Sequence, residues 1–212
     1  MDITDPRIDT YLRSLQARHD EDVLLEMEAE GERRGFPIVG RNVGVTLELL
    51  ARSIQARTVF ELGSGFGYSA YWFARAVGPE GEVHCTDGDP ENEVAAAGFL
   101  ARAGLVDRIR YHVGDAVTWL ADTPGTFDVI YDDIDKDGYP AAWRAACERV
   151  RLGGLYICDN VLWSGRVPAD GEPPDAVTDA IREHNAMIAA DTRFVSSILP
   201  IRDGVMVALR IA

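Results

Sequence analysis

The chain has 212 residues, 47% of them hydrophobic, and a formal net charge of −14. This length and composition fit one α/β domain with a single core. The charge argues against nucleic-acid and anionic-membrane partners, because no basic patch is available to neutralise phosphates, and it leaves room for bound cations. The three cysteines are unclustered, no signal-peptide pattern is visible, and no apolar run approaches membrane-spanning length, so we expect free thiols and a cytoplasmic location.

The N-terminal region, residues 1–36, predicts a helical extension. Its first helix covers about residues 6–15, where Asp5 fits an N-cap and Pro6 the first helical position. A second, charged helix covers about residues 21–34. We expect this extension to serve as a lid or as an oligomer contact, with a solvated helical extension as the alternative.

From residue 37 to residue 212, strand patterns alternate with helix patterns. The expected strands cover residues 58–62, 82–86, 109–113, 127–131, 155–158, 194–199 and 205–211. The expected helices cover residues 46–55, 68–77, 90–104, a short stretch after 115, 139–150 and 175–190. Such alternation implies parallel strands with right-handed crossovers, whereas the turn signal Asp203-Gly204 predicts a C-terminal antiparallel hairpin. We therefore expect a Rossmann-like α/β fold with a mostly parallel seven-stranded sheet and helices on both faces.

A glycine-rich turn follows the first strand of this sheet. Gly63, Gly65 and Gly67 allow positive φ angles and a close approach of the backbone to a ligand. A strand, a glycine turn and a helix form the first unit of nucleotide-binding sheets, which bind ligands at the carboxyl ends of their strands. The spacing G-x-G-x-G differs from the dinucleotide-binding pattern G-x-G-x-x-G. The alternative to a ligand-binding turn is a glycine turn that serves only to pack the helix against the strand.

Acidic residues end the next two strands. Asp87 follows the glycine turn by about 20 residues, a position suited to hydrogen-bond both hydroxyls of a ribose. Asp115 follows the third strand, where it either faces an adenine ring or caps the next helix.

The fourth and fifth strands end in acidic loops, the run DDIDKD at residues 132–137 and the pair Asp159-Asn160. Neighbouring parallel strands bring such ends together, and converging carboxylates repel one another unless a cation lies between them. Two Asp and one Asn suit Mg²⁺, with an exposed acidic turn as the alternative. Lys136 either balances this charge or, if poorly solvated, acts as a base. The four histidines are scattered, so we expect solvated or core roles for them.

The chain resembles the cation-dependent class I O-methyltransferases that use S-adenosylmethionine, the group of catechol and caffeoyl-CoA O-methyltransferases. The resemblance runs from about residue 37 to the C-terminus. It rests on four stretches: ELGSGFGYS at 61–69, DIDKDGY at 133–139, DNVLWSG at 159–165 and LPIRDG at 199–204. It implies that residues 37–212 form the S-adenosylmethionine-dependent methyltransferase domain, acting on a small aromatic acceptor, and that the protein is a homodimer.

The resemblance also assigns site residues. Asp133, Asp159 and Asn160 match the metal ligands, for Mg²⁺ with Mn²⁺ or Ca²⁺ as alternatives, and Lys136 matches the base. The matches to S-adenosylmethionine contacts are Val39, Glu61, Gly63, Ser69, Asp87, Ala116 and Asp135. Further candidates for that cofactor, from the glycine turn and the strand ends, are Ser64, Gly65, Asp115 and Asp133. Trp163 and Ser164 fall at the acceptor pocket.

The predicted function is metal-dependent methyl transfer to a hydroxyl of a small ortho-dihydroxy aromatic acceptor, catechol-like or caffeoyl-like. A metal-independent small-molecule methyltransferase shares the glycine turn but leaves the acidic loops unexplained. A non-catalytic nucleotide-binding protein on the same fold is a second alternative. A nucleotide-dependent oxidoreductase is disfavoured by the glycine spacing.

Overall fold

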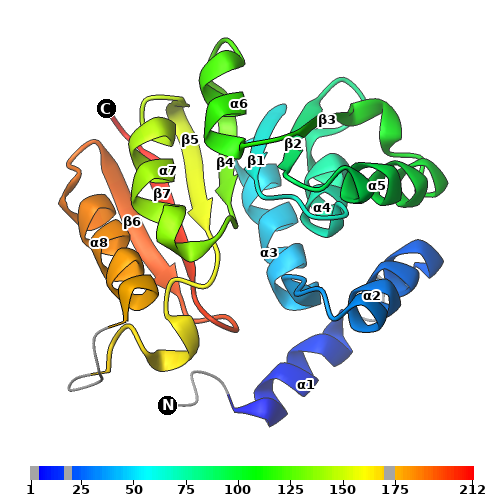
Figure 1. The fold of residues 1–212 in the computed structure, drawn as a ribbon, viewed down its shortest axis with the longest axis horizontal. Coiled ribbons are helices and arrows are strands. Elements are labelled where there is room, and N and C mark those ends of the chain that lie inside the picture. The colour runs from blue at the N-terminus through cyan, green and yellow to red at the C-terminus, as the bar shows by residue number, and fades with distance from the viewer. Residues whose placement is uncertain (1–4, 17–20, 170–174) are drawn as a thin grey trace.

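The structure is a computed structural model that describes residues 5–16, 21–169 and 175–212. At its centre lies a seven-stranded sheet with the strand order β3-β2-β1-β4-β5-β7-β6 (Figure 1). The strands are β1 (Thr58–Leu62), β2 (Glu82–Asp87), β3 (Ile109–Val113), β4 (Phe127–Asp132), β5 (Val150–Cys158), β6 (Phe194–Leu199) and β7 (Val205–Arg210). Strands β1 to β5 pair in parallel, and β7 runs antiparallel to both β5 and β6. The predicted mixed sheet with a C-terminal hairpin is therefore confirmed.

Helices cover both faces of the sheet. They are α1 (Pro6–Leu15), α2 (Asp22–Arg34), α3 (Gly40–Ser53), α4 (Tyr68–Val77), α5 (Pro90–Arg102), α6 (Ala116–Asp122), α7 (Tyr139–Ala146) and α8 (Ala176–Ala190). Side chains of α2 to α5 form one hydrophobic core with one face of the sheet, and those of α6 to α8 form a second core with the other. Because both faces are covered, the central strands are mostly apolar, and every residue of β4 is buried, including Asp128 and Asp132.

Helix α3 begins at Gly40, earlier than the predicted start at residue 46, so that prediction was wrong. The glycines of this segment hid the helix from a pattern based on apolar spacing. Gly44 is needed within the helix because a Cβ there would lie 2.1 Å from Nε1 of Trp72 on α4. The absence of a side chain at Gly44 therefore lets α3 and α4 pack closely.

Strand β5 is also longer than predicted, because it begins at Val150 and the preceding helix ends at Ala146. The pairing of β4 with β5 is irregular between Phe127 and Val129, where the glycines of β5 lie. A Cβ at Gly154 would lie 2.8 Å from the carbonyl oxygen of Asp128, so only a glycine allows this close approach. These glycines mark an irregularity inside a strand rather than the end of a helix.

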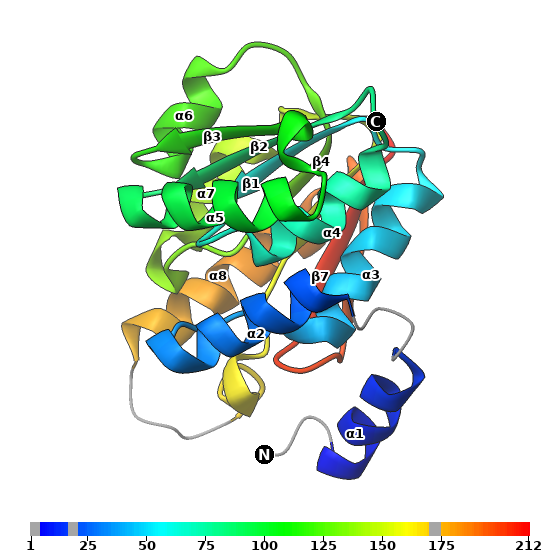
Figure 2. The same ribbon diagram turned by 90° about the vertical axis from the view of Figure 1, so that its right-hand side faces the viewer.

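The two N-terminal helices differ in how they contact the rest of the protein. Leu24 and Met27 of α2 are fully buried in the same core as α3 and α4. Helix α1 extends away from the sheet in both views, and its Tyr11 and Leu15 are more than half exposed (Figures 1 and 2). Within the described ranges, no helix combines the length and the apolar character needed to cross a bilayer.

Candidate active site

The carboxyl ends of strands β1 to β5 open onto one cavity of about 1220 Å³. Most of the residues predicted for the site line it: Val39, Gly63, Ser64, Gly65, Ser69, Asp87, Asp115, Ala116, Asp133, Asp135, Lys136, Asp159, Asn160 and Trp163. The other two predicted residues, Glu61 and Ser164, do not line it. The cavity thus gathers segments that are far apart in the sequence, as expected for the ligand-binding edge of such a sheet.

The glycine turn has the backbone conformation that its sequence predicts. Gly63, Gly65 and Gly67 have φ angles of 82°, 50° and 88°, which favour glycine. A Cβ at Gly63 would lie 2.7 Å from the carbonyl oxygen of Asp133, so the glycine turn and the acidic loop after β4 touch through their backbones. A side chain at Gly63 would therefore separate these two parts of the site.

Glu61 lies beneath this turn and is fully buried. Its Oε2 accepts a hydrogen bond of 2.9 Å from the hydroxyl of Ser64. Its Oε1 has no hydrogen-bond partner in the part of the chain that the structure describes. Burial raises the pKa of Glu61 to about 7, although hydrogen bonds from Ser69 and Ser64 oppose the shift. Glu61 therefore supports the glycine turn from below and has an acceptor atom free.

Asp87 is held in place at the end of β2 by hydrogen bonds to its carboxylate. Gly65 N–H donates to Oδ2 at 3.1 Å, and Asp89 N–H and the Asn92 side chain donate to Oδ1 at 2.8 and 3.0 Å. Asp115 lines the cavity and also caps α6 by accepting from the N–H of Thr118 at 2.7 Å. For Asp115 the two roles left open by the sequence are thus compatible.

Asp133 and Asp159 are brought to the same edge by backbone pairing that continues past the strands. The N–H of Asp133 donates to Leu62 of β1 at 2.9 Å, and the N–H of Asp159 donates to Asp132 of β4 at 3.1 Å. Asn160 follows with a φ of 55°, a left-handed conformation that asparagine adopts more readily than most residues. All three predicted metal ligands therefore line one wall of the cavity.

This pair of carboxylates has the electrostatic character of a cation site. Asp159 is 2% exposed, and Asp133 is partly buried with its side chain 22% exposed. Burial raises the pKa of both groups, and the charge of Asp133 raises that of Asp159 further. Within the described residues, Oδ1 of Asp159 is buried without a hydrogen-bond partner. An oxygen-rich wall with an unsatisfied buried carboxylate atom fits a hard divalent cation.

Lys136 lies beside these carboxylates. Its Nζ donates to Oδ1 of Asp133 at 2.8 Å and to the carbonyl of Ile134 at 3.1 Å. Burial lowers the pKa of Lys136, but attraction to Asp133 outweighs it, so the net direction is upward. The sequence raised the idea of a lysine pushed toward neutrality; in this structure Lys136 is instead a paired ammonium.

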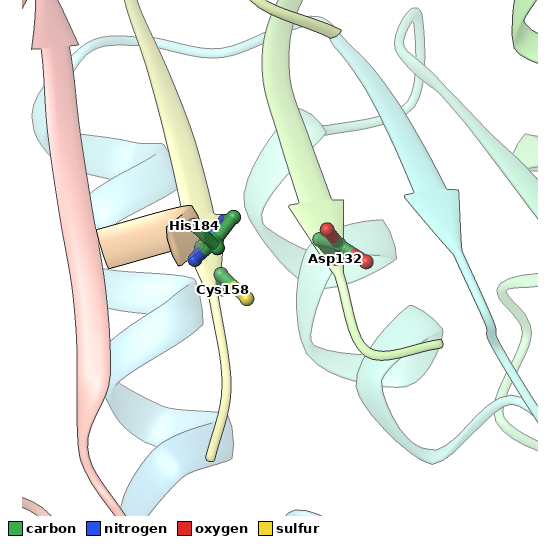
Figure 3. A group of neighbouring side chains, drawn as sticks. All are labelled: Asp132, Cys158 and His184. Carbon is green, nitrogen blue, oxygen red and sulfur yellow. The ribbon is translucent and has the colours of Figure 1, made fainter. Parts of the chain in front are cut away.

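A second polar cluster lies behind this wall, in the core next to α8 (Figure 3). One ligand-type atom each of Asp132, Cys158 and His184 lie within 4.8 Å of one another. The hydroxyl of Tyr156 donates to Oδ2 of Asp132 at 2.6 Å and lies 2.9 Å from Nε2 of His184. Burial lowers the pKa of His184 to about 4, so its ring is neutral at pH 7. We interpret this cluster as a hydrogen-bonded core network that fixes the end of β4.

The end of the cavity near the turn between β6 and β7 contains a residue that the sequence did not single out. Trp163 lines the cavity, whereas the N–H of Ser164 donates to the carboxylate of Asp203 in the turn between β6 and β7. The neighbouring Arg202 lines the cavity as well. Arg202 lies inside the LPIRDG stretch, so the sequence motif already contained this residue. The motif alone could not show that its side chain reaches the cavity, because that depends on the fold.

The seven-stranded sheet with its C-terminal antiparallel pair, together with the glycine turn at the strand ends, places the protein in the class of Rossmann-like methyltransferases. Two solved structures share this fold. The O-methyltransferase TomG from Streptomyces achromogenes, in complex with S-adenosylmethionine, matches with a TM-score of 0.84 and 29% identity over 91% of each chain. An O-methyltransferase from Bacillus cereus, in complex with S-adenosylhomocysteine, matches with a TM-score of 0.82 and 29% identity, covering 90% of this chain and 91% of the other.

Sequence comparisons narrow the class to a family. Residues 17–211 match the O-methyltransferase family model. The chain is 33% identical to a catechol O-methyltransferase from Niastella koreensis over 198 residues, 91% of this chain and 89% of the relative. It is 31% identical to caffeoyl-CoA O-methyltransferase 1 from Eucalyptus globulus over 214 residues, 95% of this chain and 80% of the relative. The chain therefore belongs to the S-adenosylmethionine-dependent O-methyltransferase family that its motifs resemble, and it is an enzyme of that type.

Proposed function

We propose that this enzyme moves a methyl group from S-adenosylmethionine to a hydroxyl of a small ortho-dihydroxy aromatic acceptor, and that it needs a divalent cation. The observation that carries the proposal is the shared wall of Asp133, Asp159 and Asn160 beside the glycine turn. The acceptor class, small ortho-dihydroxy aromatic compounds, is supported by the similarity to relatives named catechol O-methyltransferase and caffeoyl-CoA O-methyltransferase. The choice of Mg²⁺ first, with Mn²⁺ or Ca²⁺ as alternatives, follows from the all-oxygen ligand set.

The donor half of the cavity suits S-adenosylmethionine. We assign its binding to the residues predicted from the sequence, namely Val39, Glu61, Gly63, Ser64, Gly65, Ser69, Asp87, Asp115, Ala116, Asp133 and Asp135. Asp87 would bind the ribose hydroxyls, because its carboxylate is already oriented by three donors. When bound, S-adenosylmethionine supplies a methyl group on a positively charged sulfur. Closeness and alignment of this methyl with the acceptor oxygen would supply a large part of the rate gain.

The cation would be held by Asp133, Asp159 and Asn160. A bound divalent cation supplies positive charge that lowers the pKa of an acceptor hydroxyl, ordinarily about 10 for a phenol, and helps to orient the ring. Two neighbouring hydroxyls offer two oxygens to this wall, whereas a lone phenol offers only one. The proposed preference for ortho-dihydroxy acceptors follows from this difference.

Lys136 is the proposed general base. Asp133 holds the ammonium of Lys136 protonated, so Lys136 would first have to release this proton to solvent before it could take one from the acceptor hydroxyl. A cation on Asp133 would weaken the pairing and favour that release. The carbonyl of Ile134 and the ring of Tyr139, 5.1 Å from Nζ, keep the amine in position. General-base catalysis typically raises the rate of a reaction by roughly 10²–10⁴-fold. Trp163 would flank the acceptor ring, and Ser164 is proposed as its neighbour in the acceptor loop.

The deciding experiment is a methyl-transfer assay over a panel of catechols and single phenols, in metal-free buffer and with added Mg²⁺. We expect transfer to catechols only, abolished by excess chelator and restored by Mg²⁺. Full activity in chelator would support a metal-independent methyltransferase. Calorimetry showing no binding of S-adenosylmethionine would support a non-catalytic protein on the same fold.

We also propose a cytoplasmic homodimer, in which residues 1–36 act as a lid or an oligomer contact for the methyltransferase domain of residues 37–212. Support comes from α1, where Ile8, Tyr11 and Leu15 expose 51%, 63% and 56% of their surface. A second copy of the chain could cover these side chains. Sedimentation of the full chain beside a Tyr11→Asp variant tests this proposal, since a monomeric wild type would contradict it.

A further inference from the structure

We propose that Arg202 selects acceptors that carry a carboxylate on the aromatic ring, by binding that group at the outer end of the cavity. The inference rests on the proposed function and names the class of acceptor within it: catechols with an acidic substituent rather than neutral catechols.

The position of Arg202 follows from the strand order. Most of the proposed donor residues lie at the ends of β1 to β3, while Val39 lies in the connector before α3 and Asp135 lies after β4. The metal ligands follow β4 and β5, and β7 is the next strand in the sheet. Arg202 lies in the turn that enters β7, so it is on the far side of the metal ligands from the ribose position. The same turn is bonded to the acceptor loop, because Asp203 accepts from the N–H groups of Leu162 and Ser164. Arg202 therefore belongs to the acceptor end of the cavity.

The guanidinium of Arg202 is anchored but not saturated. One of its nitrogens donates to the carbonyl of Ile38 at 2.7 Å, which joins the turn to the connector before α3. The structure's described residues offer the other guanidinium N–H groups no further hydrogen bond, and the side chain is exposed at the cavity. An arginine held by one nitrogen can present the rest of its planar fork to a carboxylate.

The charge of the cavity explains why an acidic acceptor needs this residue. The aspartates that line the cavity are Asp87, Asp115, Asp133, Asp135, Asp137 and Asp159. Of the cavity-lining side chains in the described ranges, only Lys136 and Arg202 are cationic, and Lys136 is paired with Asp133. Apart from the proposed cation and the methyl donor, a carboxylate entering this cavity without Arg202 would meet mainly negative side chains.

The backbone conformation of Arg202 also supports a functional role for this residue. Its φ angle is 49°, a left-handed conformation that disfavours side chains with a Cβ and that clusters at functional sites. A glycine at this position would relieve the strain, so the arginine carries an energetic cost in this turn. Glycine is therefore also the substitution that removes the guanidinium with the least disturbance of the turn.

The test compares two acceptors that differ only in charge, 3,4-dihydroxybenzoate and its methyl ester, with wild type and the variants Arg202→Gly and Arg202→Lys. We expect wild type to prefer the acid and Arg202→Gly to lower kcat/KM for the acid about tenfold or more, because a charge-assisted hydrogen bond is lost. The ester should change by less than about twofold, and Arg202→Lys should be intermediate because lysine keeps the charge but not the fork. Arg33→Ala is the matched control, since Arg33 is 70% exposed and, among the described residues, pairs with Glu30 alone.

Other results would overturn the inference. An equal loss for acid and ester would make Arg202 only an anchor for the connector. A loss of S-adenosylmethionine affinity by calorimetry, with the acid-to-ester ratio unchanged, would mean that Arg202 serves the carboxylate of the donor. Absence of methyl transfer to either compound would count against the proposed function; calorimetry with S-adenosylhomocysteine and Mg²⁺ would still measure whether acid binding depends on Arg202.

Discussion

Replacing Asp159 by asparagine tests the proposed cation site through stability rather than activity. A ligand present at 100 times its Kd stabilises a folded protein by about 2.7 kcal/mol. For a domain of this size, 1 kcal/mol shifts Tm by roughly 2–4 °C, so saturating Mg²⁺ should raise the Tm of wild type by about 5–10 °C. If Asp159→Asn weakens binding about 100-fold, the same Mg²⁺ concentration stabilises the variant by only about 0.4 kcal/mol, a shift of about 1–2 °C.

Without a cation the asparagine variant should be the more stable of the two proteins at neutral and alkaline pH. Burial and the charge of Asp133 raise the pKa of Asp159 to about 7 in the folded state, whereas an unfolded aspartate has a pKa of about 3.9. The folded state therefore binds more protons, and this contribution to stability falls as pH rises from about 4 to about 7. In chelator, Asp159→Asn should melt above wild type at pH 8, and the difference should vanish near pH 4.

Differential scanning calorimetry with chelator or with Mg²⁺ measures both effects. Asp137→Asn is the matched control, because Asp137 is an exposed carboxylate of the same acidic loop with no proposed ligand role. Its response to Mg²⁺ should equal that of wild type. If Mg²⁺ raises the Tm of Asp159→Asn as much as that of wild type, Asp159 does not hold the cation and the proposed site is wrong.

Two further predictions address the base and the frame of the sheet. Lys136→Ala should lower kcat by about 10²–10⁴-fold while calorimetry finds S-adenosylmethionine affinity nearly unchanged; unchanged turnover would remove Lys136 as the base. Asp128→Ala should lower the Tm by about 5–10 °C, since Oδ2 of Asp128 accepts from the N–H groups of Arg57 and Thr58 at 2.7 and 2.8 Å and Oδ1 pairs with Arg151. Burial raises the pKa of Asp128, but this bonding outweighs burial and holds the pKa below its usual range. The stability that Asp128 contributes should therefore be lost as pH falls through the lowered pKa. A difference in Tm between wild type and Asp128→Ala that persists in strong acid would contradict this reasoning.

The strand pattern could be predicted because each strand is a short apolar run with clear ends. Elements rich in glycine were harder, since glycine normally signals a turn. At Gly44 it serves helix packing against Trp72, and at Gly154 it serves a close approach to the backbone of Asp128. Both roles depend on a partner far away in the sequence, so no local pattern could reveal them.

In the candidate site, too, some features could be predicted from the local sequence and others depended on the fold. The sequence grouped the carboxylates of the DDIDKD run in one loop, but the structure separates them. Asp132 is the last residue of β4 and points into the core, where Tyr156 donates to it, whereas Asp133 lines the cavity. Alternation along a strand accounts for this separation, since neighbouring side chains point to opposite faces. The prediction of a site from residue type was possible, but the orientation of each side chain depended on where the strand ended.

Different segments of the chain position the proposed acceptor side of the cavity and the proposed donor and cation sites. Asp87 is fixed by bonds within the segment from β1 to α5, and Asp133 and Asp159 are fixed by backbone pairing along β1, β4 and β5. Arg202 reaches the cavity from the β6–β7 turn, and its hydrogen bond to the carbonyl of Ile38 joins it to the connector before α3. Substitutions in this turn should therefore change which acceptor is bound while leaving cation and donor binding nearly intact. A parallel loss of all three after Arg202→Gly would mean that the turn supports the whole site.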